Sequence, residues 1–349
     1  MTNASARTLA VEVVQEVDGR YTPDALRVTE VELGPLQDGF VRVRMIYLSL
    51  DPSNRNWLRP GPPRRIGSTV IDLRSGSVML GQSIGEVTES RATNFEEGDL
   101  VAVLGPWQEI ADLAPDALRL LRPTAGEPLT AYLSVFSHVG LAALTGIRDV
   151  LDLRAGEGLL VTGAAGATGS LAVEIAHATG ARVVGVAGGA EKCEVVRSLG
   201  ADEVIDYRFD DVGTALDELF PSGIDAFFDN VGGSTLDAAL PRMAWFGRVA
   251  VCGVMSEYER TGDQRGIQGM YHVVMKALRV QGFLAERMGR PRDQQIAELR
   301  GMFAAGLVHD RPHVVAGLEH APEYLGWLFE GRNRGKLIVE VSPAPGVGG

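Results

Sequence analysis

The first third of the chain shows the two-residue alternation of apolar and polar positions that is typical of strands with one buried face. This alternation covers residues 8–50 and resumes at Val78–Val87 and Leu100–Leu104. Leu50–Trp57 breaks it and predicts a helical turn, and the Pro-, Gly- and Arg-rich residues 59–68 predict a loop. The apolar set that supports the first strands is Val11, Val13, Val31, Val41, Val43 and Ile46.

From about residue 130 strands and helices alternate instead. Residues 134–152 predict a helix, and strand-like segments then lie at 158–162, 182–187, 203–206, 224–229, 247–252 and 279–284. Alternation at this spacing is the signature of a doubly wound parallel sheet, and the number of strands matches a dinucleotide-binding fold. The fold class is therefore predicted to be α/β.

Lys336–Val341 is strand-like but falls outside that count, so we expect it to complete the β-rich part. This gives a β-rich domain of residues 1–130 and 312–349 and a dinucleotide-binding domain of residues 131–311. The active site is expected in the cleft between them, at the carboxyl ends of the parallel strands. The Pro- and Gly-rich tail after Val341 is expected to be frayed.

A glycine-rich turn follows the strand at 158–162. The turn matches the dinucleotide fingerprint as Ala164-x-Gly166-x-x-Gly169, with one glycine replaced. Leu171 and Ile175 after it have helical spacing, so the glycines stand at a helix N-terminus. Unpaired N–H groups and the helix dipole attract a pyrophosphate there. Small residues also occur in such turns for packing alone, and the alternating strands and helices favour the nucleotide interpretation.

The second strand, Arg182–Ala187, indicates which dinucleotide is bound. NAD-binding proteins usually carry Asp or Glu at its end, where it accepts bonds from the ribose hydroxyls, but this strand ends in Ala187. Lys192 follows and is placed to meet a 2′-phosphate, although Glu191 beside it weakens the charge argument. The alternative is a solvated surface lysine. We predict NADPH rather than NADH.

Charge and cysteine content limit the binding partners and the cellular compartment that we expect. The 349-residue chain has a formal net charge of −12, which argues against nucleic acid or an anionic membrane. No apolar run reaches membrane-spanning length, and no secretory segment is expected at the N-terminus. Cys193 and Cys252 are the only cysteines, so a disulfide framework and a four-cysteine zinc site are both excluded. These features favour the cytoplasm.

Four motifs together resemble one family, and the resemblance extends over nearly the whole chain. They are Leu50-Asp51-Pro52, the string Val161–Ser170, Asp229–Gly233 with Cys252–Tyr258, and Gly331–Val339. They are similar to the zinc-independent medium-chain dehydrogenases/reductases, and most closely to their NADPH-dependent alkenal/one double-bond reductases. The resemblance implies a Rossmann domain with a GroES-like β-rich domain, and a homodimer. It implies NADPH as cofactor and a small-molecule enone or enal as substrate.

The resemblance also implies site residues. The pyrophosphate would lie at Gly166, Ala167, Thr168 and Gly169, the 2′-phosphate at Lys192 and Tyr207, and Asn230 beside the cofactor. The remaining cofactor-binding residues would be Cys252, Gly253, Val254, Met255, Ser256, Phe283, Leu284, Ala285 and Asn333. Structural roles remain open for several of these. Phe283 and Leu284 could be core, Cys252 an apolar filler, Tyr207 a cap, and the two asparagines turn residues.

Two departures from the family pattern bear on chemistry. Ser53-Asn54 stands where the family often has an aromatic residue, which puts substrate size in doubt. Gly81-Gln82-Ser83 stands where zinc-dependent relatives carry a Gly-His-Glu ligand motif, so no metal is expected. His309 and His313 are separated by Pro312, which disfavours a helix that would present both.

Reduction of an activated C=C bond fits a site without metal. Hydride adds to the β-carbon of an enone or enal, and the enolate that forms needs only hydrogen-bond donors for stabilisation. Tyr258 is the candidate catalytic donor, and the alternative is an aromatic lid without a hydroxyl role. Two other functions stay open, an NADPH quinone oxidoreductase and a non-catalytic NADPH-binding protein.

Overall fold

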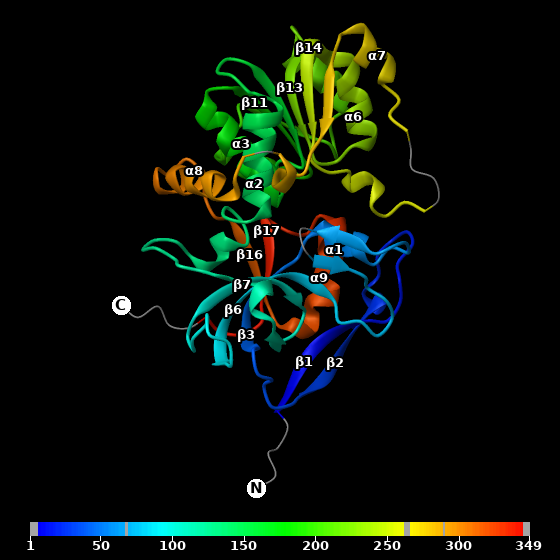
Figure 1. The fold of residues 1–349 in the computed structure, drawn as a ribbon. Coiled ribbons are helices and arrows are strands. Elements are labelled where there is room, and N and C mark those ends of the chain that lie inside the picture. The colour runs from blue at the N-terminus through cyan, green and yellow to red at the C-terminus, as the bar shows by residue number, and fades with distance from the viewer. Residues whose placement is uncertain (1–5, 67–68, 262–265, 289, 345–349) are drawn as a thin grey trace. The chain divides into compact units, whose positions relative to one another are not determined.

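The computed structural model describes residues 6–66, 69–261, 266–288 and 290–344 (Figure 1). The chain divides into two compact units, Met1–Leu133 with Pro312–Gly349, and Ser134–Arg311. These divisions fall within three residues of the boundaries expected from the sequence. The catalytic and cofactor-binding roles assigned to the two domains stay predictions. The end of the Pro- and Gly-rich tail, residues 345–349, lies outside the described residues.

The first unit is built on a mixed sheet. Its strand order, within the described residues, is β16-β17-β3-β6-β7-β9, with β8 also paired to β3. β17 runs antiparallel to β3 and parallel to β16, so Lys336–Glu340 belongs to this sheet and not to the parallel one. The strands of the unit are β1 (Ala6–Val13), β2 (Leu26–Leu33), β3 (Val41–Ser49), β4 (Arg64–Ile66), β5 (Thr69–Ile71), β6 (Leu80–Ser90), β7 (Leu100–Pro106), β8 (Ile110–Leu113), β9 (Leu118–Leu120), β16 (Pro312–Ala316) and β17 (Lys336–Glu340).

Two helices of this unit are α1 (Pro52–Trp57) and α9 (Ala321–Glu330). α1 confirms the helical turn predicted at 50–57. Asp51 and Asn54 form its capping box, each side chain satisfying the other's backbone N–H. The loop predicted at 59–68 is partly wrong, because β4 pairs with β5 in a hairpin. Proline and glycine content marked this region as irregular, but a short hairpin depends on cross-strand pairing that composition does not show.

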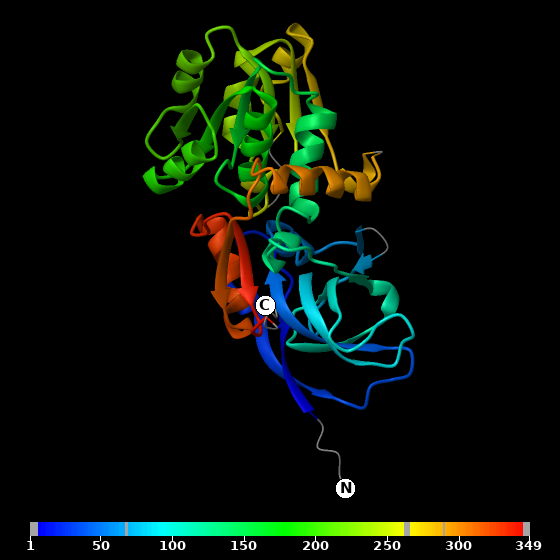
Figure 2. The ribbon, with the colours of Figure 1, turned by 90° about the vertical axis from the view of Figure 1, so that its left-hand side faces the viewer.

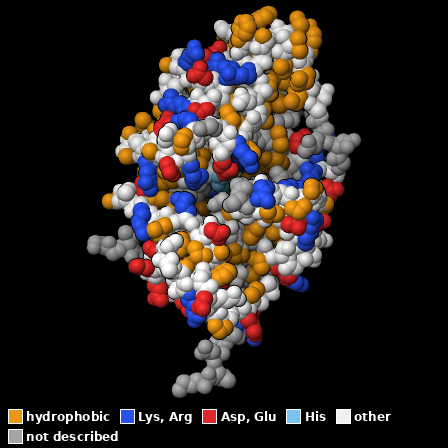
Figure 3. Space-filling model, viewed as in Figure 1, with side chains coloured by type: hydrophobic (Ala, Val, Ile, Leu, Met, Phe, Trp, Pro, Cys, Tyr) orange, Lys and Arg blue, Asp and Glu red, His pale blue; other side chains and the backbone are white. Residues whose placement is uncertain are grey.

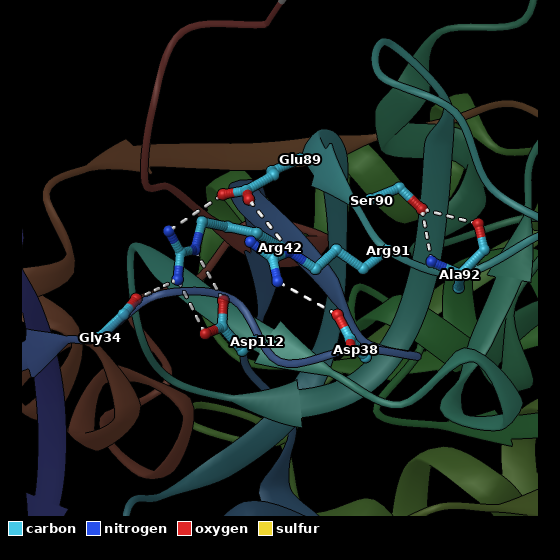
Figure 4. A network of polar contacts seen from close by, with 8 residues as sticks. All are labelled: Gly34, Asp38, Arg42, Glu89, Ser90, Arg91, Ala92 and Asp112. Carbon is cyan, nitrogen blue, oxygen red and sulfur yellow. Dashed lines mark hydrogen bonds and ion pairs between the residues drawn. The ribbon is translucent and has the colours of Figure 1, made fainter.

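Arg42 on β3 contacts β8, β6 and the segment that follows β2 (Figure 4). Its guanidinium forms a two-point ion pair with Asp112 on β8, with N–O distances of 2.7 and 2.9 Å. It also donates to Glu89 on β6 at 3.3 Å and to the carbonyl of Gly34 at 2.7 Å. The hydrogen bond with Asp112 raises the pKa of Arg42. The planar fork of arginine fits such bidentate contacts and fixes the register of β3 between β6 and β8.

The second unit is a parallel sheet with helices on both faces (Figures 1 and 2). Its strand order within the described residues is β12-β11-β10-β13-β14-β15, so the order reverses between β10 and β13. Ligands of such folds bind at this reversal, beyond the carboxyl ends of the strands. The strands are β10 (Gly158–Thr162), β11 (Arg182–Ala187), β12 (Glu203–Asp206), β13 (Ile224–Asp229), β14 (Met243–Val251) and β15 (Arg279–Gly282).

The helices of this unit are α2 (His138–Thr145), α3 (Ala167–Thr179), α4 (Ala190–Ser198), α5 (Val212–Leu219), α6 (Gly233–Ala239), α7 (Met270–Met275) and α8 (Arg292–Ala304). The predicted α/β doubly wound class is confirmed, and every predicted strand of the sheet is present. The bounds of two strands shift, since β14 begins four residues earlier and ends at Val251, and β15 ends at Gly282. The predicted helix 134–152 begins only at His138, where the Ser137 side chain accepts from the Val139 N–H.

Leu160, Val184 and Phe227 lie on adjacent strands and are fully buried in the core of this unit. These strands read as continuous apolar runs because a parallel sheet is covered on both faces. Among the described residues, no helix is both long and apolar enough to cross a membrane.

Candidate cofactor-binding site

The turn between β10 and α3 has its left-handed residue at Gly163, with φ +60°. Ala164 then donates its N–H to the carbonyl of Val186 on β11 at 3.1 Å, and Gly166 donates to the carbonyl of Gly163 at 2.9 Å. The fingerprint predicted from the sequence begins at Ala164, in place of its first glycine. In the structure the turn instead has the pattern Gly163-x-x-Gly166-x-x-Gly169, and Gly163 was missed.

Gly169 lets α3 pack closely on this turn. A Cβ at Gly169 would lie 2.1 Å from the carbonyl oxygen of Gly163, closer than any side chain can approach, and one at Gly166 would lie 3.1 Å from the same oxygen. No side chain caps the start of α3, so its first-turn N–H groups remain available to an anion. These features fit a dinucleotide pyrophosphate bound at Gly166–Gly169.

Asp229, at the carboxyl end of β13, organises the neighbouring turn and was not assigned from the sequence. Its buried carboxylate accepts from Thr162 Oγ1 at 2.7 Å and from the N–H groups of Val231 and Gly232, both at 3.0 Å. Thr162 Oγ1 in turn accepts from the Asn230 N–H at 2.9 Å. Burial raises the pKa of Asp229 even though these bonds oppose the change. The ends of β10 and β13 are thereby locked together at the reversal of strand order.

Asn230 is held by this network. Its Nδ2 donates to the carbonyl of Thr162 at 2.7 Å. Because this bond engages the amide nitrogen, Oδ1 is the atom of the amide that is left to contact a ligand. Asn230 therefore has a structural role in the turn, which is the alternative that the sequence left open. Contact with the cofactor stays a prediction.

The segment Cys252–Ser256 lies against the Asp229–Val231 turn, so the structure joins these two sequence motifs. Cys252 donates its N–H to the carbonyl of Asp229 at 2.8 Å, and Ser256 donates its N–H to that of Val231 at 3.0 Å. Gly253, Val254 and Met255 lie between these two contacts. Burial and the nearby Asp229 raise the pKa of Cys252 to about 12, so its thiol is not a nucleophile at neutral pH.

Tyr258 follows this segment and is half-buried. Its backbone N–H donates to the carbonyl of Met255 at 3.3 Å. Burial raises the pKa of Tyr258, and the nearby backbone of Val254 opposes that rise. Burial therefore favours the protonated phenol, which has a hydrogen to donate.

The three residues that follow β15 differ in their burial. Phe283 packs edge-on against Phe228, with ring centroids 6.3 Å apart, and a Cβ at Gly146 would lie 2.2 Å from the ring of Phe228. These contacts favour the core alternative for Phe283. Leu284 is 66% exposed and is not core, whereas Ala285 is partly buried. Contact of all three with the nicotinamide stays a prediction.

Lys192 and Tyr207 lie near the ends of β11 and β12. The Tyr207 ring lies over Gly188, where a Cβ would be 2.6 Å from the ring. Tyr207 is 54% exposed and Lys192 is half-buried, so both side chains can reach a ligand. Burial and then the nearby Arg208 lower the pKa of Lys192, and Glu191 opposes this. The structure brings Lys192 together with Arg208, a residue that the sequence analysis did not single out.

Asn333 belongs to the other unit, between α9 and β17. Its Nδ2 donates to the carbonyl of Gly335 at 3.0 Å, as expected of a turn asparagine, and its cofactor contact stays a prediction. Near it, Lys336 forms a buried ion pair with Asp51, so the N-terminal and C-terminal sequence motifs meet inside this unit. No three His, Cys, Asp or Glu side chains of the described residues lie together as a metal site would require. That no zinc is needed stays a prediction.

A doubly wound sheet with an uncapped helix at a glycine-rich turn defines a dinucleotide-binding protein. Comparison with known proteins narrows this class. The family of zinc-binding dehydrogenases matches residues 167–300, and the N-terminal domain of oxidoreductase matches residues 10–121.

Three similar proteins cover most of the chain. The 2-alkenal reductase (NADP(+)-dependent) of Nicotiana tabacum is 35% identical, with 86% of this chain and 87% of that protein covered. The NADPH-dependent curcumin reductase of Escherichia coli is 34% identical, with 93% and 94% covered. The solved structure of CurA from Vibrio vulnificus in complex with NADPH superposes with a TM-score of 0.87 at 30% identity, with 97% and 100% covered. The chain therefore belongs to the medium-chain dehydrogenases/reductases, in the group of NADPH-dependent alkenal and enone reductases.

Proposed function

We propose that this protein reduces the C=C bond of α,β-unsaturated ketones or aldehydes with NADPH. The observation that carries the proposal is the turn at Gly163–Gly169, which no side chain caps and where a Cβ at Gly169 would meet the backbone of Gly163. This turn lies beside a second strand that ends without an acidic residue. The names of the similar proteins support the same reaction.

In the proposed reaction, bound NADPH supplies hydride to the β-carbon, and negative charge develops on the carbonyl oxygen of the substrate. The backbone at Gly166–Gly169 holds the pyrophosphate, and Asn230 and Cys252–Ser256 line the nicotinamide side. Tyr258 donates a hydrogen bond to the enolate oxygen. The α-carbon then takes a proton from Tyr258 or from water, which completes the addition of one hydride and one proton.

The experiment that tests this function follows NADPH absorbance with a matched panel of enals, enones and quinones. We expect turnover of enals and enones that is faster than turnover of quinones. Turnover restricted to quinones would assign the protein as a quinone oxidoreductase. NADPH binding without turnover of any compound would indicate a non-catalytic binding protein. The panel should include small and bulky enones, because Ser53-Asn54 leaves substrate size undetermined.

Lys192→Glu is expected to weaken NADPH binding roughly tenfold or more and to leave NADH binding nearly unchanged. A charge-assisted contact with the 2′-phosphate contributes on the order of 1.5–3 kcal/mol, and only NADPH carries that phosphate. Fluorescence titration of both cofactors measures the change. Arg197→Glu is the matched control, because Arg197 carries the same charge on the last turn of α4. Equal losses of NADPH and NADH affinity would mean that Lys192 does not contact the phosphate.

We also propose that the protein is a homodimer that associates through α7. Hydrophobic side chains gather over α7 (Figure 3), among them Tyr271 and Val274, which is 76% exposed. Trp245 and Phe246 are also exposed beside it, and Phe246 donates its N–H to the carbonyl of Lys276 at 2.8 Å. Contiguous apolar surface of this kind usually marks an interface.

Val274→Glu is expected to convert the dimer to a monomer, because the introduced carboxylate would be buried without a partner in the interface. Sedimentation velocity measures the change. Val70→Glu in β5 is the control, since Val70 is an exposed valine of the other unit. A wild-type monomer, or a Val274→Glu variant that stays dimeric, would contradict the proposal.

We place the protein in the cytoplasm as part of the same proposal. Cys193 and Cys252 are both free, and Cys193 is buried while Cys252 is half-buried near Asp229. A reducing compartment suits such thiols. Cell fractionation with an antibody to the native protein tests the assignment.

A further inference from the structure

Two turns meet beside the carboxyl ends of β11 and β12. Tyr207 donates its N–H to the carbonyl of Ala187 at 3.1 Å. The Asp206 carboxylate then accepts from the N–H of Gly189 at 2.9 Å and from the N–H of Arg208 at 3.1 Å. Asp206 therefore fixes the turn that begins α4 and the turn that carries Arg208 relative to each other.

This arrangement places the Arg208 guanidinium beside the turn that precedes α4. A Cβ built at Gly189 would lie 3.5 Å from Nη1 of Arg208. Lys192 stands on the first turn of the same helix, near enough to Arg208 for the two charges to interact. Because residue 189 is glycine, no side chain from it occupies the space beside this guanidinium.

No carboxylate of the described residues forms an ion pair with the guanidinium of Arg208 or the ammonium of Lys192. Asp206 and Asp210 flank Arg208 in sequence, but Oδ1 of Asp206 accepts two backbone N–H groups and Oδ2 of Asp210 accepts the N–H of Asp206. Two neighbouring cations repel each other, and this pair occurs in a chain whose net charge is −12. An anionic ligand between them would remove that cost.

We propose that Arg208 is a second phosphate-binding residue and that, with Lys192, it determines the preference for NADPH over NADH. The inference rests on the proposed function, because it takes the phosphate to be the 2′-phosphate of the cofactor. Arginine is suited to this role because its planar fork can donate two hydrogen bonds to one phosphate, whereas lysine acts as a point charge. Neither the sequence motifs nor the family resemblance assigned Arg208.

The test is a fluorescence titration of the purified wild-type protein and its variants with NADPH and with NADH. The affinities for 2′,5′-ADP and 5′-AMP are measured by their competition with the bound cofactor. Arg208→Gln is expected to weaken NADPH and 2′,5′-ADP about tenfold each. NADH and 5′-AMP should change by less than about twofold, as for an ordinary surface substitution. Arg208→Lys should retain part of the preference. Arg197 lies on α4, the helix of Lys192, and pairs with Glu194, so Arg197→Gln should change none of these affinities.

The outcomes separate this inference from the function on which it rests. A wild-type protein that binds NADPH and NADH equally would overturn both. A wild-type preference that Lys192→Gln abolishes and Arg208→Gln leaves intact would overturn the role of Arg208 alone. Equal weakening of all four ligands in Arg208→Gln would show that the guanidinium contacts the common adenosine part, and would also overturn the inference.

Discussion

Tyr258→Phe is expected to lower kcat for an enone by ~10²–10³ while NADPH affinity stays nearly constant. The substitution keeps the ring and removes only the hydroxyl. Burial favours the protonated form of that hydroxyl, so it has a hydrogen to donate. We expect this hydrogen to stabilise the charge that develops on the substrate oxygen. A cofactor ribose hydroxyl that shares this role would make the loss smaller.

The pKa of Tyr258 predicts the pH dependence of this contribution. Burial raises the pKa of the phenol above its ordinary value, so the hydroxyl stays protonated and remains a donor throughout the neutral range. Loss of the donor by ionisation should appear only above about pH 10, the ordinary pKa of tyrosine. Steady-state kinetics from pH 6 to 9, run as a comparison of wild type and Tyr258→Phe, should show a constant ratio of kcat values.

Tyr258→Ala is the companion variant. If kcat is unchanged in Tyr258→Phe and falls strongly in Tyr258→Ala, the ring acts as a wall and the hydroxyl has no catalytic part. Weaker NADPH binding in Tyr258→Phe would instead place the hydroxyl against the cofactor. Either result would contradict the role that we propose.

Gly169→Ala is expected to weaken NADPH binding at least tenfold and to lower the free energy of unfolding by about 1–3 kcal/mol. The added Cβ would lie 2.1 Å from the carbonyl oxygen of Gly163 and 2.9 Å from the Cα of Ala164. Both are backbone atoms, so the contact can be relieved only by moving α3 away from the turn. The same movement would displace the N–H groups that we expect to hold the pyrophosphate.

Gly301→Ala is the matched control, because Gly301 lies within helix α8 and a Cβ there meets nothing within 4 Å. Alanine should stabilise that helix by roughly 0.5–1 kcal/mol and leave NADPH binding unchanged. Denaturant unfolding and cofactor titration measure both variants. An NADPH affinity in Gly169→Ala equal to wild type would mean that the turn does not hold the cofactor.

The sequence placed most local elements correctly, because each depends on residues close together in the chain. The strand at 158–162 and the helix after its glycine-rich turn follow from an apolar run, a break and helical spacing. The hairpin of β4 and β5 was missed because its stability depends on pairing across strands, which the composition of 59–68 does not reveal. Strand order could not be read either, since it is set by contacts between residues far apart in sequence.

Some features of the candidate site can be recognised in the sequence, and others depend on the tertiary structure. The sequence by itself revealed the glycine-rich turn after β10 and the absence of an acidic residue at the end of β11, because these features depend on residues close together in the chain. Only the tertiary structure decided that Asp229 locks β10 to β13 and that Arg208 approaches Lys192. Asp229 and Arg208 are ordinary polar residues in the sequence, and they acquire these roles because parallel strands bring their carboxyl ends to one edge of the sheet. Folding supplies such neighbours through long-range packing, which no pattern of nearby residues contains.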